Sequence, residues 1–376
     1  MSRPQRRRAL RGVAAVLALP ALATLPACGL RQPLHLGFVG TLSRRASDLG
    51  ESGRNGVMLA VETRNAAGGL AGQPVRLAVE DDGQNARQAK LAFEALQAAG
   101  VHAVVGPFTS AMATTLVPLA GAAGLPLVSP TVTSMDFYGK DDPLFRIHRT
   151  TRDNARDYAT VLAARGWRRA AVAMDVGNRS FTQSWLAEFS PAFADGGGRV
   201  VLVESYSGDV DASATALVRR LVQARPDGLL FLSNTLDTAR LAQRSALLAP
   251  GLPRAAAEWA ATEVLPELGG RAIDGLLILQ AYDRDDPSPR YRAFDEAFRR
   301  RFLRAPGYAA VAAHDAASVL MQAHERRQRG QSLRDALLAN GPYDGLQQLI
   351  RFDGNGDTER RIVFTEVRDG TFRALQ

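Results

Sequence analysis

Small hydroxyl side chains occur at two places where an apolar segment ends, and there they could hold an anion. The apolar run 103–105 breaks off shortly before Ser110, and the run 125–128 is followed in the same way by Thr131 and Thr133. N–H groups at the start of a helix are free to bind an anion, and neighbouring parallel strands end at one edge of a sheet. We therefore predict that the two loops hold a carboxylate. Alternatively, Ser110 caps its helix, which does not exclude contact with a ligand.

The segments around these loops alternate in a way that is typical of a parallel sheet covered on both faces. In the first part we expect strands at 34–39, 75–80, 102–105 and 125–128, and helices at 52–66, 86–98 and 111–123, with Asn85 as the cap of the second helix. An extended segment at 140–150 precedes a second set with helices at 154–165, 181–194, 212–224 and 238–248 and strands at 169–174, 199–205, 228–232, 255–257 and 275–280. Thr151 or Asp153 would cap the first helix of this set. Helices at 291–303 and 308–329 and antiparallel strands near 349–352, 362–365 and Phe372 complete the chain.

The pattern predicts an α/β fold with two Rossmann-like lobes, whose parallel central sheets are joined by a hinge that the chain crosses several times. We expect residues 34–148 and 284–342 in the N-terminal lobe, and residues 149–283 and 343–376 in the C-terminal lobe. Such a hinge leaves a cleft that can close around a ligand.

The first 27 residues have the features of a signal peptide. Five arginines between residues 3 and 11 precede an apolar run at 12–24, which is too short to span a bilayer. Leu25, Ala27 and Cys28 then resemble a bacterial lipobox, although Pro26 is less usual in that motif. We expect residues 1–27 to be removed and Cys28 to carry the lipid, followed by a short spacer to residue 33.

Two alternatives to this processing remain open. A plain secretory peptide could be cleaved near Ala23 or Ala27, with Cys28 incidental. The run Arg6 to Leu10 is also compatible with export by a twin-arginine route.

Charge and composition argue against several classes of function. Five positive charges lie in the leader, so its removal lowers the net charge from +8 to +3, and no basic stripe alternates with aromatics as in nucleic-acid binding proteins. The single cysteine excludes a disulfide framework, and the five histidines never cluster at metal-ligand spacing. No phosphate loop, dinucleotide fingerprint or nucleophile elbow occurs, so we expect no metal, no cofactor and no catalysis. The run 353–357 opens like a calcium loop, but Thr358 replaces the required glycine, so we expect a hairpin turn.

From residue 34 to its end, the chain resembles the type I periplasmic binding proteins, specifically the leucine/isoleucine/valine-binding branch of ABC-transporter receptors. The resemblance lies in five short motifs that occur in the order and spacing of that branch: Asn65 to Val75, Asp81-Asp82, Val104 to Ser110, Val128 to Thr133, and Phe352 to Asp357.

The resemblance implies roles for several side chains. Ser110, Thr131 and Thr133 would hold the α-carboxylate of the ligand, and Glu258 would bind its α-ammonium group from the second lobe. Phe181 falls near the aromatic residue that the family uses in the second lobe, but it could equally belong to the core. Asn234 follows the next strand and would line the cleft.

Departures from the family pattern concern the choice of ligand. Arg44 stands where glycine is common, and Leu49 replaces an aromatic residue. If the Arg44 side chain points into the cleft, it would bind a second anionic group of the ligand. If it points to solvent, it says nothing about which ligand the protein binds. Branched-chain amino acids are therefore the family's default ligand and not a deduction from the pocket.

Together these observations predict a lipid-anchored, extracytoplasmic solute receptor of an ABC importer. Its partners would be a small amino acid or related carboxylate, the permease subunits in the membrane and the lipid at Cys28. The alternative is a sensory or cell-wall-assembly lipoprotein that uses the same fold to dock a kinase or an envelope enzyme.

Overall fold

The computed structural model of the protein describes residues 33–43 and 47–375, and from Pro33 onwards they form one compact unit. The predicted signal peptide, the predicted lipidation site at Cys28 and the predicted ligand contact at Arg44 lie outside the described residues. In the described part, no helix combines the length and the apolar character that crossing a membrane requires.

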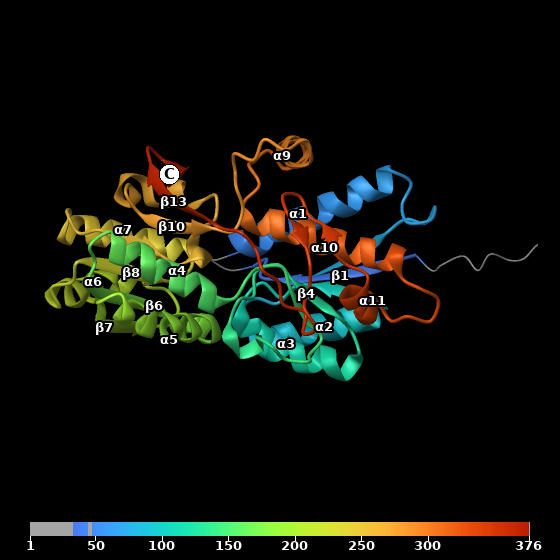
Figure 1. Ribbon diagram of the computed structural model, residues 1–376, viewed down its shortest axis with the longest axis horizontal. Coiled ribbons are helices and arrows are strands. Elements are labelled where there is room, and N and C mark those ends of the chain that lie inside the picture. The colour runs from blue at the N-terminus through green and yellow to red at the C-terminus, as the bar shows by residue number, and fades with distance from the viewer. Residues whose placement is uncertain (1–32, 44–46, 376) are drawn as a thin grey trace, which may run out of the picture. The chain divides into compact units, whose positions relative to one another are not determined.

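The first sheet contains five parallel strands in the order β2-β1-β3-β4-β5. They are β1 (His35–Gly40), β2 (Arg76–Asp81), β3 (Ala103–Val105), β4 (Leu127–Ser129) and β5 (Leu144–Arg146). Helices α1 (Asp48–Ala66) and α10 (Tyr308–Arg326) cover one face, and α2 (Ala86–Ala98) and α3 (Ser110–Ala123) cover the other (Figure 1). Alternate residues of β1 explain this arrangement, because Phe38 packs into the core under α1 and Val39 into the core under α2 and α3.

The second sheet repeats the same order before two strands are added. β7 (Arg199–Tyr206), β6 (Arg169–Asp175), β8 (Gly228–Leu232), β9 (Arg254–Ala256) and β10 (Leu277–Gln280) are parallel neighbours in that sequence. β13 (Val363–Arg368) and β14 (Thr371–Ala374) continue the sheet in antiparallel fashion. The associated helices are α4 (Thr151–Ala164), α5 (Arg179–Asp195), α6 (Asp211–Gln223), α7 (Thr235–Leu248) and α8 (Leu265–Gly269). The predicted fold class, two Rossmann-like lobes with parallel central sheets, is confirmed.

After α9 (Pro289–Phe302) and α10, the chain forms α11 (Leu333–Ala339) and a small antiparallel pair, β11 (Tyr343–Asp344) and β12 (Leu349–Ile350). This pair belongs with the first lobe, because Gln322 of α10 donates to the Asp344 carbonyl and Tyr343 donates to the Ala336 carbonyl. We therefore propose that the chain makes its last crossing between residues 353 and 362, later than the boundary expected at residue 342.

Several expected boundaries are wrong in detail. Helix α1 begins at Asp48, four residues early, and α4 is capped by Thr150 and not by Thr151 or Asp153. The turn at 353–357 is not a hairpin, because β12 pairs with β11 while β13 pairs with β10 and β14. Pairing partners in a sheet depend on distant segments, and a local pattern does not contain them. The cap of α2 is confirmed: Asn85 accepts from the N–H groups of Arg87 and Gln88.

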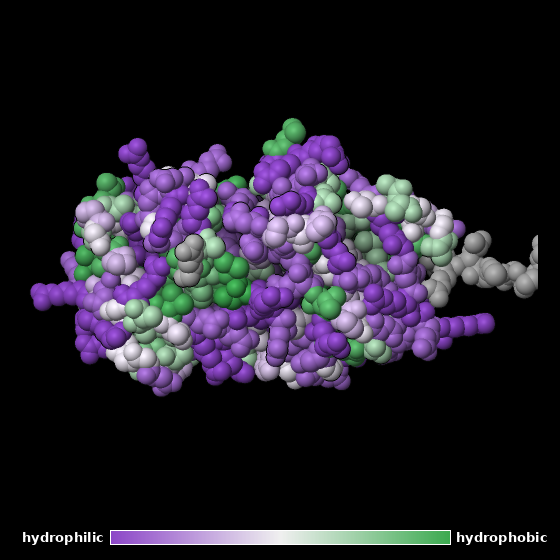
Figure 2. Space-filling model, turned by 45° about the horizontal axis from the view of Figure 1, so that its top comes forward, coloured by the Kyte–Doolittle hydropathy of each residue, from purple (hydrophilic) through white to green (hydrophobic). Residues whose placement is uncertain are grey.

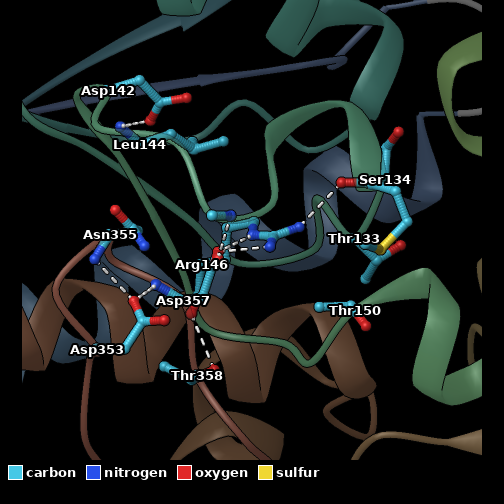
Figure 3. Close-up of polar contacts among 12 residues, drawn as sticks. Thr133, Ser134, Asp142, Leu144, Arg146, Thr150, Asp353, Asn355, Asp357 and Thr358 are labelled. Carbon is cyan, nitrogen blue, oxygen red and sulfur yellow. Dashed lines mark hydrogen bonds and ion pairs between the residues drawn. The ribbon is translucent and has the colours of Figure 1, made fainter.

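A buried ion pair holds the last crossing segment against the first lobe (Figure 3). Arg146 at the end of β5 donates from Nε to Asp357 at 2.6 Å and from Nη1 to the Ser134 carbonyl at 3.0 Å. Asp357 also accepts from the backbone N–H of Gly139, and Thr358 donates to the Arg146 carbonyl. Arg146 is fully buried and Asp357 is 6% exposed, so neither charge is solvated and each depends on the other.

The face of the molecule in Figure 2 is largely hydrophilic, with a contiguous apolar patch left of centre. The large exposed apolar side chains, such as Leu247 and Leu303, are scattered over the sequence.

Candidate functional site

Strand ends from both lobes surround two adjoining cavities. The smaller one, the inner chamber, has a volume of about 20 Å³ and is lined by Ser110, Thr131, Thr133, His148, Asn178, Phe181, Glu258 and Tyr308 in addition to the shared residues. The larger one, the outer chamber, measures about 570 Å³ and includes Asp175, Asn234 and Asp237. Leu49, Phe108, Thr109 and Trp259 line both chambers.

Ser110 is the first residue of α3 and lies in the wall of the inner chamber. The cap is Thr109, whose hydroxyl accepts from the Met112 N–H, so Ser110 does not cap the helix. In the described part of the chain the Ser110 hydroxyl has no hydrogen-bond partner, although the side chain is only 2% exposed. A buried hydroxyl at a helix N-terminus is well placed to donate to an anion.

The two threonines after β4 differ in what they can offer. Thr131 donates its hydroxyl proton to the Phe108 carbonyl at 2.6 Å, so towards a ligand it can only accept. Thr133 accepts from the Thr151 hydroxyl at 3.0 Å and keeps its own proton to donate. Ser110 and Thr133 can therefore donate to a ligand carboxylate as predicted, whereas the Thr131 hydroxyl can only accept from a donor group of the ligand.

Asn178, which the sequence did not single out, joins the two lobes at this point. It lies between β6 and α5, and its Oδ1 accepts from the Ala111 N–H of α3 at 2.9 Å. This N–H is one of the free donors that a ligand carboxylate would use. Asn178 lies three residues beyond the end of β6, at the end of the short 3-10 helix Val176–Asn178, and nothing in the local sequence marked it as part of the site.

Glu258 follows β9 and begins a short 3-10 helix, Glu258–Ala260. Its Oε1 accepts from Asn154 at 2.8 Å and its Oε2 from the Trp185 indole at 3.2 Å. Burial raises the pKa of this carboxyl group, which is 6% exposed. Both donors are neutral, and no lysine or arginine of the described residues forms an ion pair with Glu258. A carboxylate in this position would gain most from a cation in the chamber.

Aromatic and imidazole groups complete the inner chamber. Phe181 packs in the second lobe's core and also reaches the chamber, where its ring lies 5.9 Å from that of Trp259 in a T-shaped pair. His148 is buried, and burial together with Arg360 and Arg149 lowers its pKa to about 3. It is therefore neutral near pH 7 and does not supply Glu258 with a counterion.

The outer chamber contains Asn234, as predicted for the cleft, but this side chain is already bonded. Its Oδ1 caps α7 by accepting from the Asp237 N–H, and its Nδ2 donates to the Asp237 carboxylate at 2.9 Å. Asp175 lies at the end of β6, and burial and the nearby Asp237 raise its pKa to about 6. The sequence analysis missed both aspartates.

The structure thus brings Ser110, Thr131, Thr133, Phe181 and Glu258 into one chamber and Asn234 into the adjoining one. Their contact with a ligand stays a prediction. Within residues 33–43 and 47–375, no group of three or more His, Cys, Asp or Glu side chains could hold a metal ion.

Comparison with known proteins gives this geometry a context. The sequence model of a family described as periplasmic binding protein matches residues 33–371. A Leu/Ile/Val-binding protein of Rhizobium johnstonii is 26% identical over 200 residues, which cover 53% of this chain and 54% of that protein. The chain thus aligns with only about half the length of this relative. A leucine-, isoleucine-, valine-, threonine- and alanine-binding protein of Pseudomonas aeruginosa is 22% identical over 86% of this chain and 87% of its own.

Solved structures agree in fold. The branched-chain amino acid transporter substrate-binding protein of Streptococcus pneumoniae, in complex with isoleucine, has a TM-score of 0.83 at 19% identity and covers 91% of this chain and 98% of its own. A solute-binding protein of R. palustris in complex with benzoate has a TM-score of 0.82 at 19% identity, with coverages of 91% and 95%. These two neighbours hold different ligands, so the shared fold leaves the ligand of this chain open.

Proposed function

We propose that this chain, which belongs to the periplasmic binding protein family, is the extracytoplasmic solute receptor of an ABC importer. It captures an amino acid or a related small carboxylate between its two lobes and delivers it to a permease in the membrane. The proposal for the ligand's head group rests on the inner chamber, and the proposal for delivery rests on the family.

The observation that carries the proposal is the pairing of unlike groups across the inner chamber. The free hydroxyl of Ser110 offers a donor for a carboxylate, and the Ala111 N–H at the start of α3 offers a second one once its bond to Asn178 opens. Glu258 offers a buried carboxylate without a protein cation, which suits an ammonium group. An α-amino acid carries both groups on its α-carbon, so its head can satisfy the two sides at once.

A thermal-shift screen against amino acids, amides and simple carboxylates tests this function. A ligand at a hundredfold excess over its Kd raises the free energy of unfolding by about 2.7 kcal/mol, which gives an easily measured rise in Tm. A protein that responds to no α-amino acid, at any concentration up to the millimolar range, would contradict the proposal.

Ser110→Ala should weaken binding of the ligand found in that screen by about 10- to 100-fold, because a hydrogen bond to a charged group contributes about 1.5–3 kcal/mol. Affinity is measured by titration calorimetry. Ser190→Ala is the matched control, since that hydroxyl bonds the Leu186 carbonyl within α5 and does not line either chamber. Equal affinities for the Ser110 variant and the wild type would remove the serine from the site.

We also propose that the receptor is anchored to the membrane through lipid on Cys28, a residue outside the described part of the chain. Cys28→Ser should abolish incorporation of labelled fatty acid and release the protein into the soluble extracytoplasmic fraction. The chain has no other cysteine, so residual labelling in this variant would show that the anchor lies elsewhere.

A further inference from the structure

The outer chamber is much larger than the inner one and has a different chemistry. The inner chamber of about 20 Å³ admits little more than one water molecule, so its walls must move apart before it takes the head group of an amino acid. The outer chamber of about 570 Å³ is then the space left for the side chain. Leu49, Phe108, Thr109 and Trp259 line both chambers, and the three apolar side chains among them are suited to a stem of methylene groups. The terminal group of the ligand's side chain would then lie at the far end of the outer chamber.

Three carboxylates line the outer chamber: Asp175, Asp209 and Asp237. Among the described residues that line it, there is no lysine, arginine or histidine. Asp209 already forms an ion pair with Arg240, a residue that does not line the chamber. The other two aspartates have no arginine or lysine within ion-pair distance in the described part of the chain.

Asp175 and Asp237 come from different elements and meet through Asn234. Asp175 is 5% exposed and Asp237 is 4% exposed. Asn234 donates to Asp237 at 2.9 Å and reaches Asp175 at 3.5 Å, and the Tyr206 hydroxyl donates to Asp237 at 3.4 Å. Asp175 also accepts from the Gly177 N–H at 2.7 Å, and the charge of Arg240 favours the ionised form of Asp237 without forming an ion pair with it. The two carboxylates still repel each other, so a cationic group of the ligand beside them would lower their free energy.

We propose that the side chain of the ligand carries a cationic group, an ammonium or guanidinium, which binds Asp175 and Asp237 in the outer chamber. The inference rests on the proposed function, because it places the ligand's head in the inner chamber. It assigns the protein to basic amino acids and not to the branched-chain aliphatic ones. A ligand with a second anionic group, the possibility that Arg44 raised, would face three carboxylates.

Titration calorimetry with four amino acids tests the proposal on the full chain. L-lysine and L-norleucine share the head group and the methylene stem and differ in the terminal ammonium, while L-arginine and L-glutamate extend the comparison to a guanidinium and an anion. We expect L-lysine or L-arginine to bind at least 10-fold more tightly than L-norleucine, and L-glutamate not to bind measurably.

Asp237→Asn and the double variant Asp175→Asn/Asp237→Asn should weaken binding of the basic amino acid by about 10- to 100-fold more than they change binding of L-norleucine, whose side chain has no charge. Asp211→Asn is the control, since it removes an equal charge from the first turn of another helix, α6, outside the chamber lining. The single variant and the wild-type ranking suffice should the double variant not fold.

The outcomes separate this inference from the proposed function. Tighter binding of L-norleucine than of L-lysine, still sensitive to Ser110→Ala, would overturn the cationic side chain and keep the amino acid receptor. An unchanged affinity for L-lysine in Asp237→Asn would also overturn it. If none of the four amino acids binds, the inference fails, and a negative result in the wider screen would extend that failure to the proposed function.

Discussion

Glu258→Gln is expected to weaken binding of an amino acid ligand by about 2–5 kcal/mol, or roughly 30-fold to several thousandfold in Kd. The side chain keeps its size, so the variant removes the charge alone. Without it, the ligand's ammonium group would be buried opposite a neutral amide, while the Trp185 indole would face an amide group in place of a carboxylate oxygen. Titration calorimetry on the folded variant measures the effect.

Glu204→Gln provides the matched control, because that glutamate pairs with Arg220 at the surface and lines neither chamber. Its ligand affinity should equal that of the wild type. Retention of full affinity by the Glu258 variant would show that this carboxylate serves the structure of the second lobe, through Asn154 and Trp185, and not the ligand.

The second large effect concerns stability. Asp357→Asn should lower the free energy of unfolding by about 3–5 kcal/mol, because it leaves the fully buried Arg146 without its carboxylate. Chemical denaturation followed by circular dichroism measures the change, with ligand absent.

Two further variants test whether the unpaired charge of Arg146 causes this loss of stability. Asp344→Asn removes a carboxylate from an exposed pair with Arg290 and should cost less than about 1 kcal/mol. The double variant Arg146→Met/Asp357→Leu should recover much of the loss, since it removes both charges and not one of them. A loss in the double variant as large as in Asp357→Asn would mean that packing, and not the unpaired charge, decides the effect.

Local sequence pattern was enough to place most of the secondary structure. Asn85 before an amphipathic run predicted the start of α2, and β8 was expected over the residues that form it. The same logic brought Ser110, Thr131 and Thr133 together, because their strands, β3 and β4, are parallel neighbours in one sheet.

Contacts between distant segments were beyond that logic. Asn178 meets Ala111 and Arg146 meets Asp357 only because the chain crosses between the lobes, and 211 residues separate the second pair. Asp175 and Asp237 gain their meaning from a shared chamber, whereas in sequence each is an ordinary acid after a strand or at a helix start. The local sequence around a residue does not show which distant segment its side chain will contact.

The repeated strand order of the two sheets brings strand ends and helix starts from both lobes to one cleft. At the start of α3, the Ala111 N–H is already bonded to Asn178 from the second lobe. A ligand carboxylate that took over this N–H would break one hydrogen bond between the lobes as it formed its own. The duplicated architecture would thus make ligand and protein side chain compete for one backbone donor.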